Sequence, residues 1–451
     1  MGESKSIGIV GAGWVGLVTG GCFAELGHDV VVRDVVPEKI EALGAGRLPF
    51  HEPGLPGMLE RNRERLRYTT DADELGRADV LFICVQTPPT YSGDADLSYV
   101  WTALDHLPRT ERRQILVMKS TVPVGTGEKV RAALEARGLT NVGYVSNPEF
   151  LAEGNAVHDF LNPDRIVVGA FHAEDGVAVE GLYSGIDAQV VRTDVGSAEM
   201  IKLAANAFLM TRISFINEIA NVCEAVGADV VEVARGVGLD RRLGPHFLRA
   251  GIGYGGSCFP KDSLALKQLA SNSGYHFQLL SAVIEVNELQ KRRVISKLQK
   301  HLGKLRGKKV ALLGLAFKPG TDDMREAPSI VLASRLLAEG AEVRAWDPVA
   351  QPGELLKGAL ICDSVVDAVT GADAAVIVTE WEELRGLASE QVRVAMARPL
   401  IVDGRNLLDP DETRAAGFAY EGIGRPTSEF AALPEIPEPP EGAPVGPTET
   451  S

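Results

Sequence analysis

The chain contains the segment Ser6-Ile7-Gly8-Ile9-Val10-Gly11-Ala12-Gly13-Trp14-Val15-Gly16, in which a short apolar strand, a glycine turn and a helix start follow one another. The turn has the form GxGxxG. Gly11 and Gly13 permit a tight bend and a close approach to a pyrophosphate, and Gly16 lets the helix pack on the strand. The helix N-terminus then faces the phosphates. This context predicts a dinucleotide-binding unit; the alternative is a glycine turn in an α/β domain that binds no nucleotide.

An acidic residue follows the turn at the distance expected for a ribose contact. Residues 29–33 are typical of a second strand, which ends at Asp34, about 20 residues after the turn. A carboxylate here accepts hydrogen bonds from the adenosine ribose and would repel the extra phosphate of NADP. We therefore expect NAD as the cofactor, although the neighbouring Arg33 weakens this preference slightly.

Three further apolar segments each end in a polar loop. The expected strands and the loops after them are 80–85 with 86–89, 115–118 with 119–126, and 143–145 with 146–154. Ligands bind at the carboxyl ends of parallel strands, so these loops should converge on one cleft. Glu149 and Glu153 are four residues apart and would share a face if their segment were helical, which suits acid–base chemistry. The alternative for this pair is a solvated helix face.

The glycine-rich segment 251–262, GIGYGGSCFPKD, delivers Cys258 to the start of a helix. Pro260 suits the first helical turn, and apolar residues continue after it at helical spacing. The positive end of a helix favours thiolate over thiol, which predicts a nucleophile at Cys258. Lys261 and Asp262 place a cation and a potential base within about one helical turn of the sulfur. The alternative is a buried structural cysteine beside a flexible turn.

Two long helices are expected in the middle of the chain. Residues 196–227 lack breakers and carry apolar residues at helical spacing, with Lys202 and Asn206 on one face. A lysine among apolar neighbours can lose its solvation and become useful in proton transfer; the alternative is a surface lysine beside a polar amide. A second helix is expected over 279–301. Two such helices between α/β domains suit a connector or a dimerisation surface.

A second strand-to-turn pattern begins at residue 308 and resembles a degenerate Rossmann unit. A helix from Pro328 and strands over 341–347, 374–378 and 400–403 continue it. Because the full glycine fingerprint is missing, this half is expected to bind a nucleotide differently. The cations placed near its ligand edge are Lys318, Arg325 and Arg405, for which the alternative is ordinary surface charge.

Composition excludes several classes of protein. Of the 451 residues, 45% are hydrophobic and 24% are charged, which predicts a soluble protein of two or three domains. The formal charge of −15 argues against a nucleic-acid partner. No apolar run approaches the roughly 20 residues of a membrane span, and no signal peptide precedes the first strand. The five scattered cysteines lack metal-ligand or disulfide spacing, so we expect reduced thiols, no metal site and a cytoplasmic location.

The predicted fold class is α/β, with two Rossmann-like doubly wound domains joined by a long central helix and a helical dimerisation region. The expected domains are an NAD-binding domain over 1–195, a central helical domain over 196–302, a C-terminal nucleotide-binding domain over 303–427, and a disordered tail over 428–451. The tail is rich in proline and glutamate and poor in aromatic residues, as disordered segments are.

Taken together, these motifs resemble the UDP-glucose/GDP-mannose dehydrogenase family. The matching segments are GAGWVG (11–16), KSTVPVGT (119–126), NPEFLAEG (147–154), the helix with Lys202 and Asn206, GLDRRLGPHFLRAGIGYGGSCFPKD (238–262), GLAFKPGTDDMRE (314–326) and DGRN (403–406). The resemblance covers about residues 5–425, and GGSCFPKD with the residues before it is similar to the UDP-glucose branch. It implies an NAD-dependent, two-step oxidation of UDP-glucose to UDP-glucuronate without release of the aldehyde.

The resemblance also implies how the two oxidations proceed. Lys202 and Asp262, through a water, would handle the proton of the C6 hydroxyl as the first hydride leaves. Cys258 would then attack the aldehyde, and the resulting thiohemiacetal would lose a second hydride to give a thioester.

Hydrolysis of that thioester needs an activated water. The resemblance assigns this activation to Glu149 with Thr121, and the stabilisation of the oxyanion to Lys202 and Asn206. Glu153 matches a family position implicated in the same region.

Further residues are assigned to ligands by the same resemblance. For NAD they are Gly11, Gly13, Val15, Gly16, Asp34, Thr87, Thr121, Glu153 and Arg325. For the sugar nucleotide they are Glu149, Phe150, Leu151, Lys202, Asn206, Phe247, Leu248, Arg249, Gly255, Phe317, Lys318, Arg405 and, reaching into a partner subunit's site, Arg242. Arg249 stands where a lysine is common and Gln86 where a glycine or asparagine is, and we expect neither to alter the reaction.

Two alternatives to this function stay open. One is the same chemistry on GDP-mannose or a UDP-N-acetylhexosamine, and the other is a non-catalytic sensor of sugar nucleotides that retains the fold. The set Lys202, Asn206, Cys258 and Asp262 argues against a sensor, because binding alone does not require it. In every case we expect a homodimer or a larger homo-oligomer.

Overall fold

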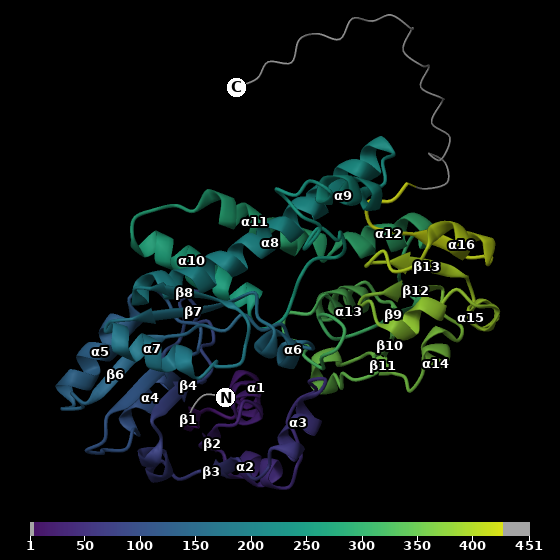
Figure 1. Ribbon diagram of the computed structural model, residues 1–451. Coiled ribbons are helices and arrows are strands. Elements are labelled where there is room, and N and C mark those ends of the chain that lie inside the picture. The colour runs from purple at the N-terminus through teal and green to yellow at the C-terminus, as the bar shows by residue number, and fades with distance from the viewer. Residues whose placement is uncertain (1–3, 427–451) are drawn as a thin grey trace, which may run out of the picture.

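The first sheet is built around β1 (Ser6–Val10), the strand that leads into the glycine turn. In the computed structural model, which describes residues 4–426, its strands lie in the order β3-β2-β1-β4-β5-β6-β7-β8 (Figure 1). Neighbours are parallel except β6 and β7, which are antiparallel. The other strands are β2 (Asp29–Arg33), β3 (Leu66–Thr69), β4 (Val80–Ile83), β5 (Gln114–Met118), β6 (Val142–Ser146), β7 (Arg165–Ala170) and β8 (Gln189–Thr193).

Helices cover both faces of this sheet because its inner strands are apolar on both sides. Phe23 and Phe82 belong to the core on one face, and Leu81 and Val130 to the core on the other. One face is covered by α1 (Trp14–Glu25), α3 (Leu55–Arg61), α6 (Ala156–Leu161) and α7 (Ala173–Gly181), and the other by α4 (Ser98–Asp105) and α5 (Thr126–Ala136). This doubly wound arrangement confirms the predicted fold class for the first half.

The second sheet repeats the strand order of a Rossmann unit. Its strands are all parallel and lie in the order β11-β10-β9-β12-β13-β14, with β9 (Lys309–Leu313) beside the switch point. Asp347 ends β10 and accepts hydrogen bonds from the amides of Leu315 (2.6 Å) and Ala316 (3.1 Å), much as Asp34 accepts one from Ala12 (2.8 Å). The degenerate second unit is therefore confirmed. Its remaining strands and helices are β10 (Glu342–Trp346), β11 (Leu360–Ile361), β12 (Ala374–Ile377), β13 (Leu400–Asp403), β14 (Ala419–Glu421), α13 (Pro328–Ala338), α14 (Val365–Val369), α15 (Glu390–Ala395) and α16 (Pro410–Ala415).

One 32-residue helix, α8 (Val195–Val226), connects the two sheets (Figure 1). Asp194 caps its start by accepting a hydrogen bond from the amide of Ser197 (2.8 Å), and Gly227, with φ +78°, ends it in the left-handed conformation. The long helix expected over 196–227 is confirmed.

The second long helix, expected over 279–301, is in fact two helices, α11 (Gln278–Gln290) and α12 (Arg293–Leu302), so this prediction was wrong. Tertiary contacts account for the break between α11 and α12. Buried Lys291 pairs with Glu288 (2.7 Å) and lies 3.9 Å from Glu326, and α12 then packs on the second domain rather than continuing along α8. The other helices of this region are α9 (Val230–Gly238) and α10 (Phe259–Asn272), while α2 (Pro37–Gly44) belongs to the first domain.

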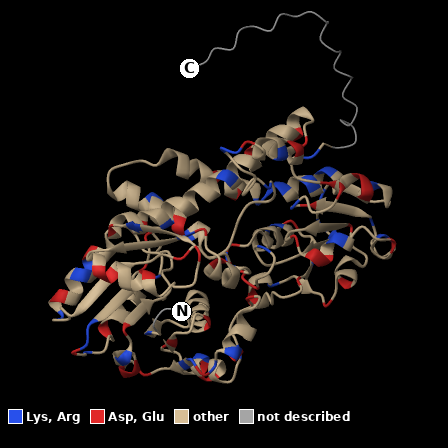
Figure 2. Cartoon of the chain, viewed as in Figure 1, with Lys and Arg blue, Asp and Glu red and all other residues tan. Residues whose placement is uncertain are grey.

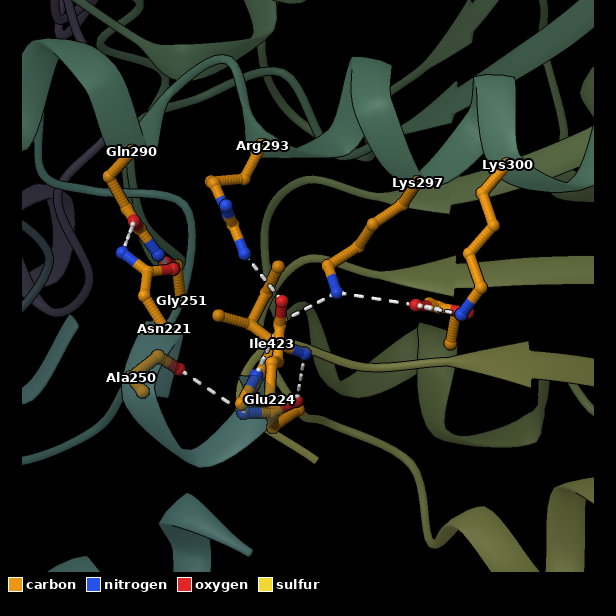
Figure 3. Close-up of polar contacts among 12 residues, drawn as sticks. Asn221, Glu224, Ala250, Gly251, Gln290, Arg293, Lys297, Lys300 and Ile423 are labelled. Atoms are coloured by element: carbon orange, nitrogen blue, oxygen red, sulfur yellow. Dashed lines mark hydrogen bonds and ion pairs between the residues drawn. The ribbon is translucent and has the colours of Figure 1, made fainter. Parts of the chain in front are cut away.

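A cluster of buried charges fixes the second domain on the C-terminal half of α8. Glu224 accepts hydrogen bonds from Arg293 (2.5 Å), from Lys297 (2.6 Å) and from the amide of Gly424 (2.8 Å), as Figure 3 shows in part. Glu421 accepts further hydrogen bonds from the same helix α12. Burial alone would raise the pKa of Glu224, but Lys297, the amide of Gly424 and Arg293 together hold that pKa below its usual value. The cluster therefore joins α8, α12 and the last strand through ionised groups.

Charges of both signs are interspersed over the two domains (Figure 2). Within residues 4–426, no helix is long and apolar enough to cross a membrane. All five cysteines are free thiols. The cytoplasmic location stays a prediction, and the tail predicted over 428–451 lies outside the described residues.

Candidate active site

A cavity of about 850 Å³ lies where the two sheets and α8 meet. The loop after β6, the middle of α8, the segment before α10 and the first loop of the second domain supply its walls. It brings together most of the predicted catalytic and substrate residues: Glu149, Phe150, Leu151, Glu153, Lys202, Asn206, Phe247, Arg249, Gly255, Cys258, Phe317, Lys318 and Arg405.

Lys202 and Glu149, which both line the cavity, form a buried ion pair. The Nζ atom of Lys202 lies 2.9 Å from Oε1 of Glu149, and both side chains are only 4% exposed. Burial would raise the pKa of Glu149, but Lys202, the amide of Leu151 and the charge of Lys119 together lower that pKa. Burial would likewise lower the pKa of Lys202, but Glu149, then Cys258 and Asp262, raise it. An ionised ammonium group is thus held in a site from which water is largely excluded.

One turn further along α8, Asn206 connects this helix to α10 through the carboxylate of Asp262. Asn206 donates a hydrogen bond to Oδ2 of Asp262 (2.6 Å), and Lys261 donates one to Oδ1 (2.6 Å). Lys261 also approaches the hydroxyl of Thr87 (3.4 Å), which itself donates to the carbonyl of Thr121 (2.9 Å). Asp262, Thr87 and Thr121 therefore lie behind the cavity wall, on the side of the first domain's loops.

Cys258 occupies the N-cap position of α10, as predicted, but its thiol is not acidified there. Burial, together with the charge of Glu149, raises the pKa of Cys258 to about 11, although Lys202 opposes the increase. The expected thiolate was therefore wrong: the pKa of Cys258 is raised, not lowered. Desolvation of the sulfur outweighs the partial charge of the helix end.

Glu149 and Glu153 do not share a helix face, because residues 147–155 form an irregular loop. Glu153 turns away from the ion pair and accepts a hydrogen bond from the hydroxyl of Ser257 (3.0 Å). It also lies 3.7 Å from Arg325 of the second domain. Burial, and then the nearby charge of Asp323, raise the pKa of Glu153 to about 7. This carboxyl group can exchange a proton near neutral pH.

Arg405, from the second domain, lines the cavity with its guanidinium group. Arg405 donates from Nε to the carbonyl of Val378 (2.8 Å) and from Nη1 to that of Gly253 (2.9 Å). Its buried Nη2 has no hydrogen-bond partner among residues 4–426. This atom is the open donor that a ligand with acceptor oxygens could satisfy.

Two side chains contact the carbonyl groups of the segment 247–251, which lies beside Arg405. Gln290 donates a hydrogen bond to the carbonyl of Gly251 (2.8 Å), and Figure 3 shows both residues. The side chain of Asn406 lies 3.5 Å from the carbonyl of Ala250. Leu248 points into the core rather than into the cavity.

Arg242, a predicted substrate residue, also lies outside the cavity, on the surface of the protein. Its side chain is 83% exposed and pairs with Asp240 (2.6 Å). The cavity of the same chain therefore lacks it.

Comparison with known proteins decides the family. Models of three consecutive domains match: the NAD binding domain of the UDP-glucose/GDP-mannose dehydrogenase family over 5–187, its central domain over 196–289 and its UDP binding domain over 311–410. The chain belongs to the UDP-glucose/GDP-mannose dehydrogenase family. The resemblance noted from the sequence is confirmed, and the protein is an NAD-dependent dehydrogenase.

Individual members of this family match over nearly their whole length. The UDP-glucose 6-dehydrogenase TuaD of Bacillus subtilis is 46% identical over 94% of each chain. The structure of a UDP-glucose dehydrogenase from the archaeon Pyrobaculum islandicum matches with a TM-score of 0.88 at 38% identity, over 94% of this chain and 98% of that one. The UDP-D-ManNAc dehydrogenase of Pyrococcus horikoshii matches with a TM-score of 0.83 at 30% identity, over 93% and 99%.

The residues of the glycine turn fit the family's NAD. Gly11 has φ +104°, which favours glycine, and a Cβ atom added to Gly16 would lie 1.9 Å from the carbonyl oxygen of Gly11. A Cβ atom added to Gly13 would meet nothing within 4 Å, so space for phosphate is left beside the turn. Asp34 stands at the end of β2, bound to Lys39 (2.9 Å) and to the amide of Ala12. NAD is the cofactor, as the sequence predicts.

Some contacts that shape this dehydrogenase site could not be predicted from the sequence. Buried Lys119 donates to the side chain of Asn147 (3.0 Å) and to the hydroxyl of Tyr183 (3.0 Å), which fixes the start of the loop that carries Glu149. Ser257 bridges Glu153 and Cys258. Such contacts join segments far apart in the chain, and no spacing rule marks them.

Proposed function

We propose that this dehydrogenase oxidises the C6 primary alcohol of UDP-glucose to a carboxylate, giving UDP-glucuronate, in two steps and without release of the aldehyde. The observation that carries the proposal is the juxtaposition of a cysteine with the ion pair of Lys202 and Glu149 on one cavity wall. A dehydrogenase that performs a single oxidation needs no nucleophile beside its acid–base residues.

Sequence similarity supports UDP-glucose as the sugar nucleotide. The relative named a UDP-glucose 6-dehydrogenase shares 46% of aligned residues, whereas the UDP-D-ManNAc dehydrogenase shares 30%. The family's UDP binding domain over 311–410 supports uridine diphosphate as the carrier. Lys318 and the open Nη2 of Arg405, both in this domain, would meet the anionic or hydroxyl-rich parts of the substrate.

In the first oxidation, the side chains of α8 and α10 would handle the proton of the alcohol. Lys202 and Asp262 would act through a water, since Asp262 lies behind Asn206 and not on the cavity surface. Bound NAD supplies the hydride acceptor for both oxidations. Glu153 and Arg325 would border it where the second domain approaches the first.

In the second oxidation, Cys258 would attack the aldehyde, and the product would stay bound to sulfur as a thioester. The ammonium group of Lys202 and the amide of Asn206 would stabilise the negative oxygen that forms. Glu149, kept ionised by Lys202, would accept a proton from the hydrolytic water with Thr121 nearby.

A panel of sugar nucleotides tests the substrate. We expect kcat/KM for UDP-glucose to exceed that for GDP-mannose and UDP-N-acetylhexosamines by at least about 100-fold, since a misfitting substituent in a built site costs on the order of 3 kcal/mol. The measurement is the rate of NADH formation with each compound. Faster turnover of another sugar nucleotide would reassign the substrate, and binding without turnover of any compound would favour a sensor.

We also propose that two copies associate along α8. Four apolar side chains on this helix are more than half exposed and recur at spacings of seven, seven and four residues: Phe208 (63%), Phe215 (53%), Val222 (57%) and Val226 (63%). These spacings place them on one face of the helix. A second copy of this chain would cover that face, and the exposed Arg242 would then be free to reach the partner's cavity.

Replacing Phe215 with aspartate should convert the assembly into monomers, because a charge would be buried at the centre of this apolar stripe. Light scattering after size-exclusion chromatography measures the mass. Val394→Asp is the matched control, since Val394 is 68% exposed but lies on α15 of the second domain. If the Phe215 variant keeps the mass of the unmodified protein, α8 is not the interface.

A further inference from the structure

The thiol of Cys258 needs a proton acceptor before its sulfur can attack. Because burial raises the pKa of Cys258 to about 11, its sulfur is held as a thiol near neutral pH. A base that takes the proton during attack would remove this limit.

The charged groups near the sulfur of Cys258, which belong to Glu149, Lys202 and Asp262, already have hydrogen-bond or ion-pair partners. Lys202 is held by Glu149 at 2.9 Å, and Asp262 accepts one hydrogen bond from Asn206 and one from Lys261, each of 2.6 Å. The partner of the sulfur within residues 4–426 is the hydroxyl of the preceding residue, with a distance of 3.6 Å between Oγ of Ser257 and Sγ of Cys258.

The same hydroxyl leads away from the sulfur to a carboxylate. Ser257 donates to Oε1 of Glu153 at 3.0 Å, so its oxygen lone pairs are available to accept the thiol proton. Three groups, Cys258, Ser257 and Glu153, therefore form a continuous chain from the nucleophile to the boundary between the two domains.

Glu153 has the surroundings of a base that works near neutral pH. Its side chain is 8% exposed, and Asp323 and Arg325 face it from the second domain. Lys318, from the same loop, and Cys258 interact with it at longer range. Burial and Asp323 raise the pKa of Glu153 to about 7, while Arg325 and the Ser257 hydroxyl oppose the increase.

We propose that Ser257 and Glu153 form a proton relay for Cys258, which takes up the thiol proton as sulfur attacks the aldehyde and returns it when the thioester is hydrolysed. The proposal rests on the proposed two-step oxidation. In the attack, the S–H bond breaks and an S–C bond forms, while the C=O electron pair moves onto oxygen. Ser257 accepts the thiol proton as it passes its own proton to Glu153. Cys258 thiol, aldehyde and Glu153 carboxylate thus become thiohemiacetal alkoxide and Glu153 carboxylic acid.

Cys258 recovers its proton when the thioester is hydrolysed. The second oxidation starts from the alkoxide and releases no proton. Water then adds to the thioester, the C–S bond breaks, and the departing thiolate recovers its proton from Glu153 through Ser257. Glu149 would take the proton of the water, so the two carboxylates have separate tasks, in line with their opposite directions in the loop.

Alkylation of the thiol tests the relay without cofactor or sugar. The neutral reagent iodoacetamide is applied between about pH 5.5 and pH 9, and modification at Cys258 is followed by peptide mass spectrometry. In the unmodified protein we expect the rate to rise through a titration near pH 7, as Glu153 ionises, and again at high pH as the thiol itself ionises. In Ser257→Ala the lower titration should vanish, and the rate at pH 7.5 should fall about 100-fold.

Three further variants make the result decisive. Ser257→Thr, which keeps a hydroxyl, should restore the lower titration, and Glu153→Gln should abolish it even if the alanine variant fails to fold. Ser263→Ala is the matched control, because its hydroxyl donates to the carbonyl of Pro260 (2.7 Å) within the same helix and does not reach the sulfur. A Ser257→Ala profile that matches the control overturns the relay.

Steady-state kinetics separate this result from failure of the proposed function. With UDP-glucose, Ser257→Ala should lose kcat by about 100-fold while KM for UDP-glucose and for NAD changes less than about threefold. If the unmodified protein does not oxidise UDP-glucose, the proposed function fails, while the alkylation profile still decides whether the relay exists.

Discussion

The Cys258→Ser variant is expected to stop at the aldehyde. Serine has nearly the shape of cysteine but is a far weaker nucleophile, so the covalent step is lost and formation of UDP-glucuronate should fall by at least about 1000-fold. The first oxidation does not need the sulfur. In the presence of an aldehyde-trapping amine, the variant should therefore release about one equivalent of NADH per sugar and leave a trapped aldehyde, measured by absorbance and mass spectrometry.

Cys362→Ser is the control for this experiment. Cys362 lies in the second domain, is partly exposed and lines no part of the cavity. It should retain the full turnover of the unmodified enzyme. Continued formation of the carboxylate by the Cys258 variant would show that no covalent intermediate on this residue is required.

The Lys202→Met variant is expected to lose both activity and stability. In the proposed mechanism the ammonium group carries a proton and stabilises the oxyanion, so kcat should fall about 1000-fold. Removing one partner of a buried ion pair leaves the other charge uncompensated, which costs about 3–5 kcal/mol of unfolding free energy. The pKa of Glu149, now held by Lys202 below its usual value, should then rise because burial prevails.

The stability loss in this variant should depend on pH. Glu149 ionises less readily in the folded variant than in the unfolded chain, so the variant loses stability as pH rises, whereas the unmodified protein gains it from the lowered pKa. The gap between them should widen from about pH 4 to about pH 8 in urea titrations. Equal gaps at both ends would contradict an ionised pair.

Lys291→Met separates the two effects of Lys202. Lys291 is as deeply buried, at 1% exposure, and is paired with Glu288, but it lies outside the cavity. This variant should lose stability and keep its kcat. If kcat falls equally in both variants, the activity loss at Lys202 reflects stability alone.

Local patterns in the sequence predicted the parts of this site that depend on local geometry. The glycine turn at Gly11, the carboxylate of Asp34 and the helix that starts after Cys258 each follow from the residues within a few positions. The length of α8 follows from its uninterrupted period and its closing glycine at 227. The adjacency of the loops after β4, β5 and β6 follows from the topology of parallel sheets, but the loop 86–89 lines no part of the cavity and the loop 119–126 contributes only Lys119.

The features that depend on tertiary contacts were not predicted from the sequence. The helix expected over 279–301 breaks after Gln290, because α12 packs on the core of the second domain. Glu149 and Glu153 point in different directions because the first meets Lys202 and the second meets Ser257. The thiol of Cys258 is less acidic than its helix position indicates, since burial is a property of the whole fold.

The NADH yield from a limiting amount of UDP-glucose shows whether Cys258 retains the aldehyde for a second oxidation. The unmodified enzyme with excess NAD should release about two equivalents of NADH per sugar, with UDP-glucuronate as the product and no aldehyde captured by an added amine. A yield of about one equivalent, with free aldehyde in solution, would contradict the covalent account of Cys258.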